Sequence, residues 1–395
     1  MKRCLSSLLL LCFVLPLLKA QDNVALRHRP FQVSLIYPLS TNGPKATQFS
    51  NSLSFNMIAG YNGGLNGIEM GGFLNAIKHN ANGIQMSGFA NVVGKNLNGM
   101  QMAGFMNTTG KSANGIQMAG FTNLAAKHVK GLQFAGFANV AGKNVKGGQF
   151  SGFINVAGKD VRGIQGAGFA NYNGKDFRGL QAAGFANISS GHVRGLQLSG
   201  FLNVAKKLSG VQIGVVNYVD ELKSGAPIGL ISIVRKGGVR AIGLSRSDMF
   251  NYEATLRLGA PAFYNIVSYG WAPVENANNA WALGYGLGMM TNPERNLGIQ
   301  VEAVAYQLFE DGTWYVDELN MLNRLSANLQ LRLIGGLSLY GGVAMNAAIS
   351  QRTNIEGQVG SDLLPNELYQ DGFADGGRTR ISVFPGFQFG AMLEL

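Results

Sequence analysis

One segment of the chain matches the phosphate-binding-loop pattern in full. It runs from Gly104 to Ser112 with the glycine, lysine and serine spacing that cradles phosphate groups in nucleotide-binding proteins. The same glycine and lysine spacing recurs at residues 88–95 and 136–143, and no strand–loop–helix pattern surrounds any of these copies. We therefore interpret the match as the product of an internal repeat, and we expect no nucleotide or other cofactor.

Other side chains that could support catalysis are scattered. Two of the four histidines replace or adjoin a lysine in the repeat turns, so we expect them at the surface rather than in a metal site, which needs three or four converging ligands; the four are His28, His79, His128 and His192. One region could supply a pair of carboxylates for hydrolysis. A polar strand face and a loop explain the same residues equally well; they are Glu302, Glu310, Asp311 and Asp317. We predict no catalytic or metal-binding residues and a protein that is not an enzyme.

Positive charge is concentrated in the middle of the chain. Residues 64–209 hold fourteen Lys and Arg against three acids. Most of these cations recur every sixteen residues in two columns. The first column comprises Lys95, Lys111, Lys127, Lys143, Lys159 and Lys175, and continues at Lys207; the second, three residues later, comprises Lys130, Lys146, Arg162, Arg178 and Arg194.

These two columns are the candidate binding site. If equivalent residues stack about 5 Å apart, neighbouring cations repel by about 1 kcal/mol in water and must point into solvent. A solvated turn that keeps the protein soluble explains the columns. A basic stripe that binds anionic surface polymers, such as lipopolysaccharide phosphates or acidic glycans, explains them too. We expect no nucleic-acid partner, because no aromatic platform alternates with the cations.

The element that must position these residues is a sixteen-residue repeat. Glycine recurs at this spacing from Gly67 to Gly195 without an insertion. Within each unit a Gln, a Phe and an Asn follow the glycine, and each of them recurs with the same spacing. A β-solenoid in which each unit forms one coil has to keep its length to stay in register, whereas barrel loops tolerate insertions. We predict a solenoid of about twelve coils over residues 62–237. The alternative is a large porin-like barrel whose transmembrane strands are the repeats, which implies transport.

The flanking sequence predicts a β-barrel of the outer-membrane type. Residues 324–333 alternate apolar and polar over a length that suits a transmembrane strand. Counting residues 31–40 and 52–61 with the runs after residue 238 gives eight to ten strands. We thus expect N-terminal barrel strands in 21–61 and the remaining barrel strands in 238–395, with a long external loop between residues 351 and 378.

The N-terminus predicts export from the cytoplasm, and the composition predicts the fold class. Residues 1–20 combine a basic start, an apolar stretch and a small residue, which predicts a cleaved signal peptide that contains both cysteines. Glycine accounts for 56 of 395 residues, twice the usual share of about 7%, and charged residues for only 13%. This composition argues against long helices, coiled coils and collagen, and it predicts an all-β protein.

The repeat and the barrel-like tail together resemble a family of bacterial surface-repeat proteins. Tandem Gly-x-Gln-x-x-Gly-x-x-Asn units carry the resemblance, and residues 210–217, Gly-Val-Gln-Ile-Gly-Val-Val-Asn, match it most closely. The resemblance implies an exported outer-membrane or cell-surface protein of a Gram-negative bacterium, without catalytic residues. We therefore expect a non-enzymatic surface protein whose repeats present the basic columns to anionic polymers.

Overall fold

The computed structural model describes residues 25–273, 279–291, 296–310, 318–355, 357–364 and 370–395. The predicted signal peptide, residues 1–20, with both cysteines, lies outside the described residues. The chain divides into two compact units, Met1–Gly200 and Phe201–Leu395. Its fold is all-β, with a parallel β-solenoid of about twelve turns and a closed antiparallel β-barrel of eight strands. The predicted fold class is confirmed.

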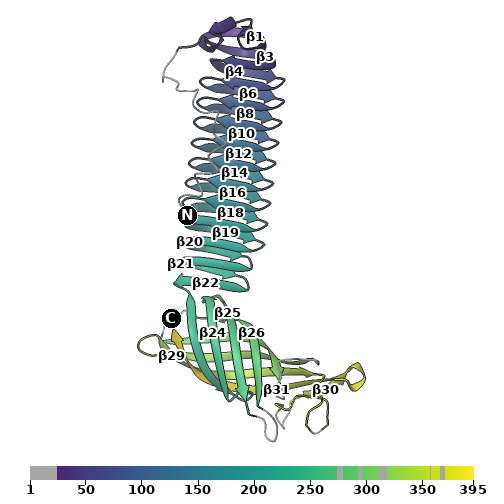
Figure 1. Ribbon diagram of the computed structural model, residues 1–395. Coiled ribbons are helices and arrows are strands. Elements are labelled where there is room, and N and C mark those ends of the chain that lie inside the picture. Colours follow the sequence, from purple (N-terminus) through teal and green to yellow (C-terminus); the bar gives the residue numbers. More distant parts are fainter. Residues whose placement is uncertain (1–24, 274–278, 292–295, 311–317, 356, 365–369) are drawn as a thin grey trace. The chain divides into compact units, whose positions relative to one another are not determined.

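The first unit consists of stacked coils, each built from one longer and one shorter strand (Figure 1). The first strands are β1 (Arg27–Ile36), β2 (Leu39–Ser40), β3 (Phe49–Asn62), β4 (Gly64–Gly71) and β5 (Leu74–Ile77), with the 3-10 helix η3 (Gly43–Gln48) before β3. The repeat strands that follow are β6 (Ala81–Ser87), β7 (Ala90–Val93), β8 (Leu97–Ala103), β9 (Met106–Thr109), β10 (Ala113–Ala119), β11 (Thr122–Ala125), β12 (Val129–Ala135), β13 (Ala138–Ala141), β14 (Val145–Ser151), β15 (Ile154–Ala157), β16 (Val161–Ala167), β17 (Ala170–Asn173), β18 (Phe177–Ala183) and β19 (Ala186–Ser199).

Each repeat strand pairs in parallel with the strand sixteen residues away, so that equivalent residues face each other. In β10 and β12, for example, Gly115 pairs with Gly131 and Gln117 with Gln133. Parallel pairing with this register identifies a solenoid coil. The alternative that makes the repeats transmembrane strands of one large barrel is wrong, because consecutive strands of an up-and-down barrel run antiparallel.

The expectation that residues 21–61 supply barrel strands is also wrong. Strands β1 and β3 pair in parallel with each other, and β3 pairs in parallel with β4, in the solenoid sheet. Buried polar side chains such as Gln32 and Asn56 face the solenoid interior from these strands. Alternation with period two occurs in a solenoid strand as in a barrel strand, so the sequence pattern could not separate them.

Two ladders of buried amide side chains fill the interior of the coils. In the glutamine ladder each Nε2 donates to the preceding coil, as from Gln133 to Gln117 Oε1 at 2.8 Å. In the asparagine ladder each Nδ2 donates to the following coil, as from Asn123 to Asn139 Oδ1 at 2.9 Å. The two ladders therefore run in opposite directions. Because their amides satisfy one another, the polar interior avoids the cost of unpaired buried groups.

Both ladders meet at Glu69, which replaces the glutamine of the first full repeat. Its Oε2 accepts a hydrogen bond from Gln85 Nε2 at 2.7 Å, and its Oε1 accepts from Asn56 and Asn62 at 3.0 and 2.7 Å. Asn56 also donates to Asn75, the first member of the asparagine ladder. Burial raises the pKa of the Glu69 carboxyl, with these donors acting in the opposite direction.

The glycine that opens each repeat allows the coils to approach closely. Gly131 has a φ of 130°, and a Cβ atom there would overlap the carbonyl oxygen of Gly115 in the preceding coil. Only glycine adopts this conformation without strain and leaves room for that carbonyl. The repeat glycine is thus a condition for stacking rather than a general source of flexibility.

The second unit begins with three solenoid strands, β20 (Leu202–Ile213), β21 (Val216–Ile228) and β22 (Ile231–Lys236). The barrel follows, with strands β23 (Val239–Ser247), β24 (Tyr252–Ala260), β25 (Phe263–Ala272), β26 (Ala280–Met290), β27 (Leu297–Phe309), β28 (Asn320–Arg332), β29 (Leu337–Ser350) and β31 (Thr379–Glu394). Pairing of β23 with β31 closes it, for example at Ser245 and Gly390. The expected count of eight to ten strands is met at its lower limit.

The predicted external loop is partly a hairpin. Strand β30 (Gln370–Ala374) pairs with β31 beyond the barrel wall, and the short 3-10 turn η4 (Asp375–Gly377) connects them. Asp371 and Arg380 form an ion pair across this hairpin at 2.9 Å. In the described residues no helix is long and apolar enough to cross a bilayer.

Candidate binding surface of the repeat unit

The longer strand of each coil positions one basic column on the outer surface. In β12, Val129 and Gln133 are buried in the coil interior, whereas Lys130 is exposed. Equivalent strands lie side by side in register, so five exposed cations follow one another at steps of about 4.8 Å. They are Lys130, Lys146, Arg162, Arg178 and Arg194. The expected stripe of like charge at this position is therefore formed.

This outer column changes its chemistry along the solenoid. In the earlier coils the equivalent positions are Asn82, Asn98 and Asn114, whose side-chain amides are joined by hydrogen bonds of 2.8 Å. The column is thus neutral through β10 and cationic from β12 onward. One acid lies beside its last cation, because Asp176 Oδ2 is 3.7 Å from Arg194 Nη1.

The first basic column, that of Lys95 to Lys175, lies in the turn after the shorter strand, where its backbone continues the ladder between coils. The amide of Lys127, for example, donates to the Lys111 carbonyl at 2.8 Å. Side-chain exposure varies within this column: Lys127, Lys159 and Lys175 are exposed, Lys111 and Lys143 are half-buried, and Lys95 is buried. The expectation that all of them point freely into solvent is wrong for Lys95.

His79 is likewise buried, so the predicted surface position is wrong for this histidine. It lines a small cavity of about 290 Å³ with Lys95, Asn80 and Ser50 among its walls. Burial, and then the neighbouring charges of Lys95 and Lys78, lower the pKa of His79. His79 occupies the position of the first column sixteen residues before Lys95, and the side chains of both residues are buried. This position accounts for the burial of His79 and for its closeness to lysines.

The pKa of His128 is affected by the positive charges of both columns. It lies between Lys127 and Val129 in the turn, half-buried. Its pKa is lowered by burial and then by Lys143, Lys130, Lys159 and Lys127, in that order. Four cations from three neighbouring coils therefore act on one imidazole, as expected for a surface that attracts anions.

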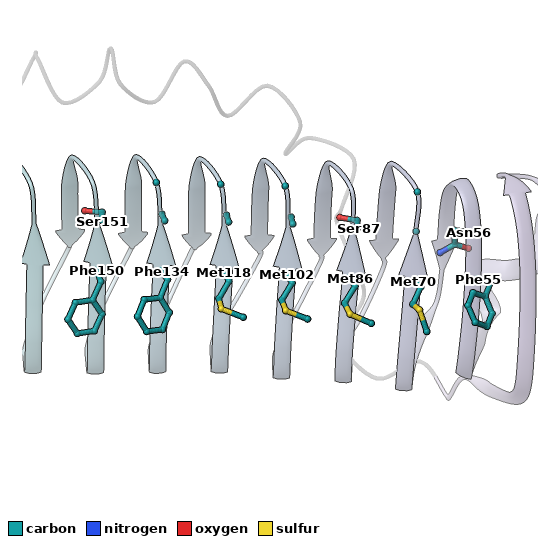
Figure 2. Close-up of a pocket in the computed structure, with 18 of the residues that line it drawn as sticks. Phe55, Asn56, Met70, Met86, Ser87, Met102, Met118, Phe134, Phe150 and Ser151 are labelled. Atoms are coloured by element: carbon teal, nitrogen blue, oxygen red, sulfur yellow. The ribbon is translucent and has the colours of Figure 1, made fainter.

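A long apolar groove lies on the same longer strands as the Lys130 column, four residues further along each strand, and the sequence interpretation missed it. Its volume is about 1390 Å³, and one wall follows the residue after each ladder glutamine. Figure 2 shows these side chains in a row from successive coils: Met70, Met86, Met102, Met118, Phe134 and Phe150. Glycine, alanine and serine after these wall residues line the other side, and Phe55, Asn56 and Met57 of β3 line one end. The sequence feature that could have indicated the groove is the recurring apolar residue x in the Gln-x-Ala-Gly segment. Such a residue also suits a membrane-facing strand, so it did not by itself predict a groove.

The segment that matches a phosphate-binding loop is a repeat turn. The amides of Gly104, Phe105, Gly110 and Lys111 donate to carbonyl oxygens of the preceding coil at 2.8–3.3 Å. A phosphate loop needs such amides free to point at the ligand. Here the solenoid ladder uses them, which agrees with the interpretation of the match as a product of the repeat.

The two candidate carboxylates that the structure describes, Glu302 and Glu310, have separate partners. Glu302 lies inside the barrel and forms an ion pair with Arg257 at 2.7 Å, whereas Glu310 accepts from Ser361 and Asn320. Asp311 and Asp317 lie outside the described residues. Within the described ranges, no three His, Cys, Asp or Glu side chains are grouped as metal ligands.

Comparisons with known proteins add no name to this geometry. No protein-family model, curated protein or solved structure matches the chain. The resemblance to bacterial surface-repeat proteins stays a prediction from the repeat residues.

Proposed function

We propose that this chain is a non-enzymatic surface protein whose barrel inserts into the outer membrane of a Gram-negative bacterium. In this proposal the repeat unit presents its basic columns to anionic polymers, such as lipopolysaccharide phosphates or acidic glycans. The observation that carries the proposal is the distribution of side chains across the barrel wall.

The barrel is apolar on its outer side, and its interior holds charged and hydrogen-bonded side chains together with an apolar cluster that includes Ile266, Val304 and Phe384. Outward-facing positions of neighbouring strands hold large exposed apolar side chains, which include Leu244, Val267, Leu283, Leu287, Val301, Leu325, Leu329, Val343, Met345, Phe387 and Phe389. A continuous apolar surface of this kind requires cover by lipid or by another apolar surface. The strands of 9–16 residues are long enough to cross a hydrocarbon core, which takes about 9–11 residues when tilted.

Charged groups inside the barrel are paired and hydrogen-bonded. Arg257 Nε lies 2.7 Å from Glu302 Oε1, which also accepts from the Tyr264 hydroxyl at 2.8 Å. Arg324 Nη1 lies 3.2 Å from Glu253 Oε2. An eight-stranded barrel has an interior that side chains fill, and these ion pairs occupy it. This packing favours an anchor over a transport pore.

A substitution on the outer wall tests the membrane assignment. Val343 lies in the middle of β29 and is 69% exposed, so Val343→Arg should hardly change the stability of a water-soluble barrel. In a bilayer the same change should cost about 2–4 kcal/mol. We would compare unfolding of the full chain in lipid vesicles with that of Val343→Thr, and also its gel mobility with and without heating. Equal stability of the two variants in vesicles would refute membrane insertion.

Neutralising three exposed cations tests the polymer assignment. The triple variant Lys130→Gln, Lys146→Gln and Arg162→Gln removes part of the stripe. The control, Lys45→Gln, Lys206→Gln and Lys236→Gln, removes the same charge at exposed positions elsewhere. Binding of purified lipopolysaccharide and of polygalacturonate at low salt should weaken at least about tenfold in the first variant, since each cation near an anionic surface contributes ~1 kcal/mol. Equal weakening in the control would refute a specific stripe.

A further inference from the structure

We propose that the apolar groove of the repeat unit binds the acyl chain of an anionic lipid. The chain lies along the solenoid axis, and the charged headgroup lies over the exposed basic column. This inference rests on the proposed function, because it assigns a ligand class to the same surface. It differs from polymer binding because it requires an apolar tail.

The shape of the groove selects a long, thin ligand. Each coil adds one wall residue at the same position and small residues in the turn after it, so the groove extends along successive coils instead of closing into a pocket (Figure 2). From Met70 to Met118 there are three steps of about 4.8 Å, roughly 14 Å in total. A lipid tail spans a similar distance, about half of the ~30 Å hydrocarbon core.

The floor of the groove stays open because glycine is required there. A Cβ atom on Gly104 or Gly120 would overlap the carbonyl oxygen of the equivalent glycine in the preceding coil. Coil stacking therefore keeps side chains out of the floor. Methionines line the wall, and their unbranched, polarizable side chains adapt to an irregular apolar ligand.

Hydrogen bonding favours an acyl chain over a peptide as the occupant. The amides of Gly88, Gly104 and Gly120, which line or flank the groove floor, donate to carbonyl oxygens of the preceding coil at 3.2–3.3 Å. An extended peptide laid across the coils would need backbone partners that the ladder already uses. An acyl chain needs none.

Charge gives the ligand a direction. Four residues before Met86, Met102 and Met118 on their strands, the outer column is asparagine. At the same separation from Phe150, the last large side chain of the groove wall, it is Lys146. One coil further, Gly166 leaves the wall without a side chain, and Arg162 lies four residues before it on the same strand, about 13 Å away. An anionic amphiphile fits this gradient with its tail along the methionines and its headgroup near the cations.

Photo-crosslinking tests the proposal in the full chain. The probes are phosphatidylglycerol with a diazirine near the end of one acyl chain, and the same lipid with the diazirine on the headgroup, each in detergent micelles. The tail probe should label peptides that contain Met86 to Met118, and the headgroup probe those that contain Lys130 to Arg162. Labelling confined to barrel peptides would overturn the proposal.

Matched variants separate groove binding from general hydrophobicity. Met102→Gln with Met118→Gln should reduce tail labelling of the repeat unit at least about tenfold, since two apolar contacts are lost. Leu180→Gln with Leu198→Gln makes a comparable change at half-buried apolar positions on coils outside the groove, Leu198 in the column of Met102 and Leu180 in the column of Met100, and should leave labelling unchanged. Equal losses in both double variants would overturn the proposal. The proposal would also be overturned if sedimentation showed that the protein is a dimer and that only the Met102 and Met118 double variant dissociates it, because a second copy of the chain would then cover the groove.

The charge variant distinguishes this inference from the polymer proposal. Lys130→Gln, Lys146→Gln and Arg162→Gln should weaken headgroup labelling by phosphatidylglycerol, while a diazirine-labelled diacylglycerol, which has no charge, should be unaffected. Loss of polysaccharide binding with normal tail labelling would leave the groove assignment intact. Normal polysaccharide binding without any labelling of the repeat unit would reject the groove assignment alone.

Discussion

Replacing Asn139 with alanine should destabilise its own coil and the coils on either side of it. The Asn139 Nδ2 donates to Phe150 O at 2.7 Å and to Asn155 Oδ1 at 3.0 Å, and its Oδ1 accepts from Asn123 Nδ2 at 2.9 Å. Asn123 keeps a bond to Phe134 O, so the change orphans two closely bonded acceptors, Phe150 O and Asn155 Oδ1, and removes a longer bond of 3.3 Å to Gln133 O. At about 1–3 kcal/mol for each, we expect a local loss of roughly 2–6 kcal/mol.

Hydrogen exchange followed by mass spectrometry on the full chain measures this loss coil by coil. Amides of residues 113–157 should exchange at least about thirtyfold faster in the variant, because each 1.4 kcal/mol corresponds to a factor of ten. Distant coils should change little, since a repeat unit contacts only its neighbours.

Asn114→Ala provides the matched control. Asn114 belongs to an asparagine ladder with the same spacing, but its hydrogen bond to Asn98 is exposed to solvent. Water replaces the lost partner there, and we expect a change below about 0.5 kcal/mol. Equal exchange rates in Asn114→Ala and Asn139→Ala would refute the conclusion that the buried amide ladder holds the coils together.

Three further predictions concern other parts of the fold. Gly131→Ala should block coil stacking and accelerate exchange in residues 113–151, whereas Gly372→Ala, which meets nothing nearby, should not. The raised pKa of Glu69 means that its contribution to stability is greatest below the ordinary carboxyl range and is lost as pH rises to the raised value; Glu69→Gln should abolish this component of the pH dependence of exchange in residues 49–87, while leaving one buried amide without an acceptor. Glu302→Gln should destabilise the barrel by about 3–5 kcal/mol in denaturant unfolding, because Arg257 stays buried without its partner, and Glu302→Leu with Arg257→Met should recover most of that loss.

The repeat made the solenoid predictable from the sequence. Insertion-free spacing of Gly, Gln, Phe and Asn required a coil of constant length, and the structure confirms parallel, in-register pairing. The closed barrel was predictable from alternation, but its boundary was not. Residues 31–40 and 52–61 alternate like barrel strands, and their parallel pairing and the buried hydrogen-bond partners of Gln32 and Asn56 place them in the solenoid.

The candidate surface was predictable only in part. Spacing placed Lys130 and Lys146 on one exposed column, because residues sixteen apart must stack in a solenoid. Burial of Lys95 and His79 depends on how the first coils pack, which the spacing does not contain. The groove depends on side-chain volumes at two adjacent positions, Met and then Ala or Ser, followed by glycine. Each of these residues taken separately was consistent with an ordinary strand.

Because of the two opposed amide ladders, the solenoid can gain or lose a repeat without losing a hydrogen-bond partner in either ladder. Each coil receives and passes on the same two hydrogen bonds, so removing residues 113–128 would bring Gln101 opposite Gln133 and Asn107 opposite Asn139 with every donor still matched to an acceptor. Glu69 would still end both ladders. Duplication or loss of a sixteen-residue unit in the gene can therefore lengthen or shorten the molecule, and its groove with it, without any change in the sequence of the barrel.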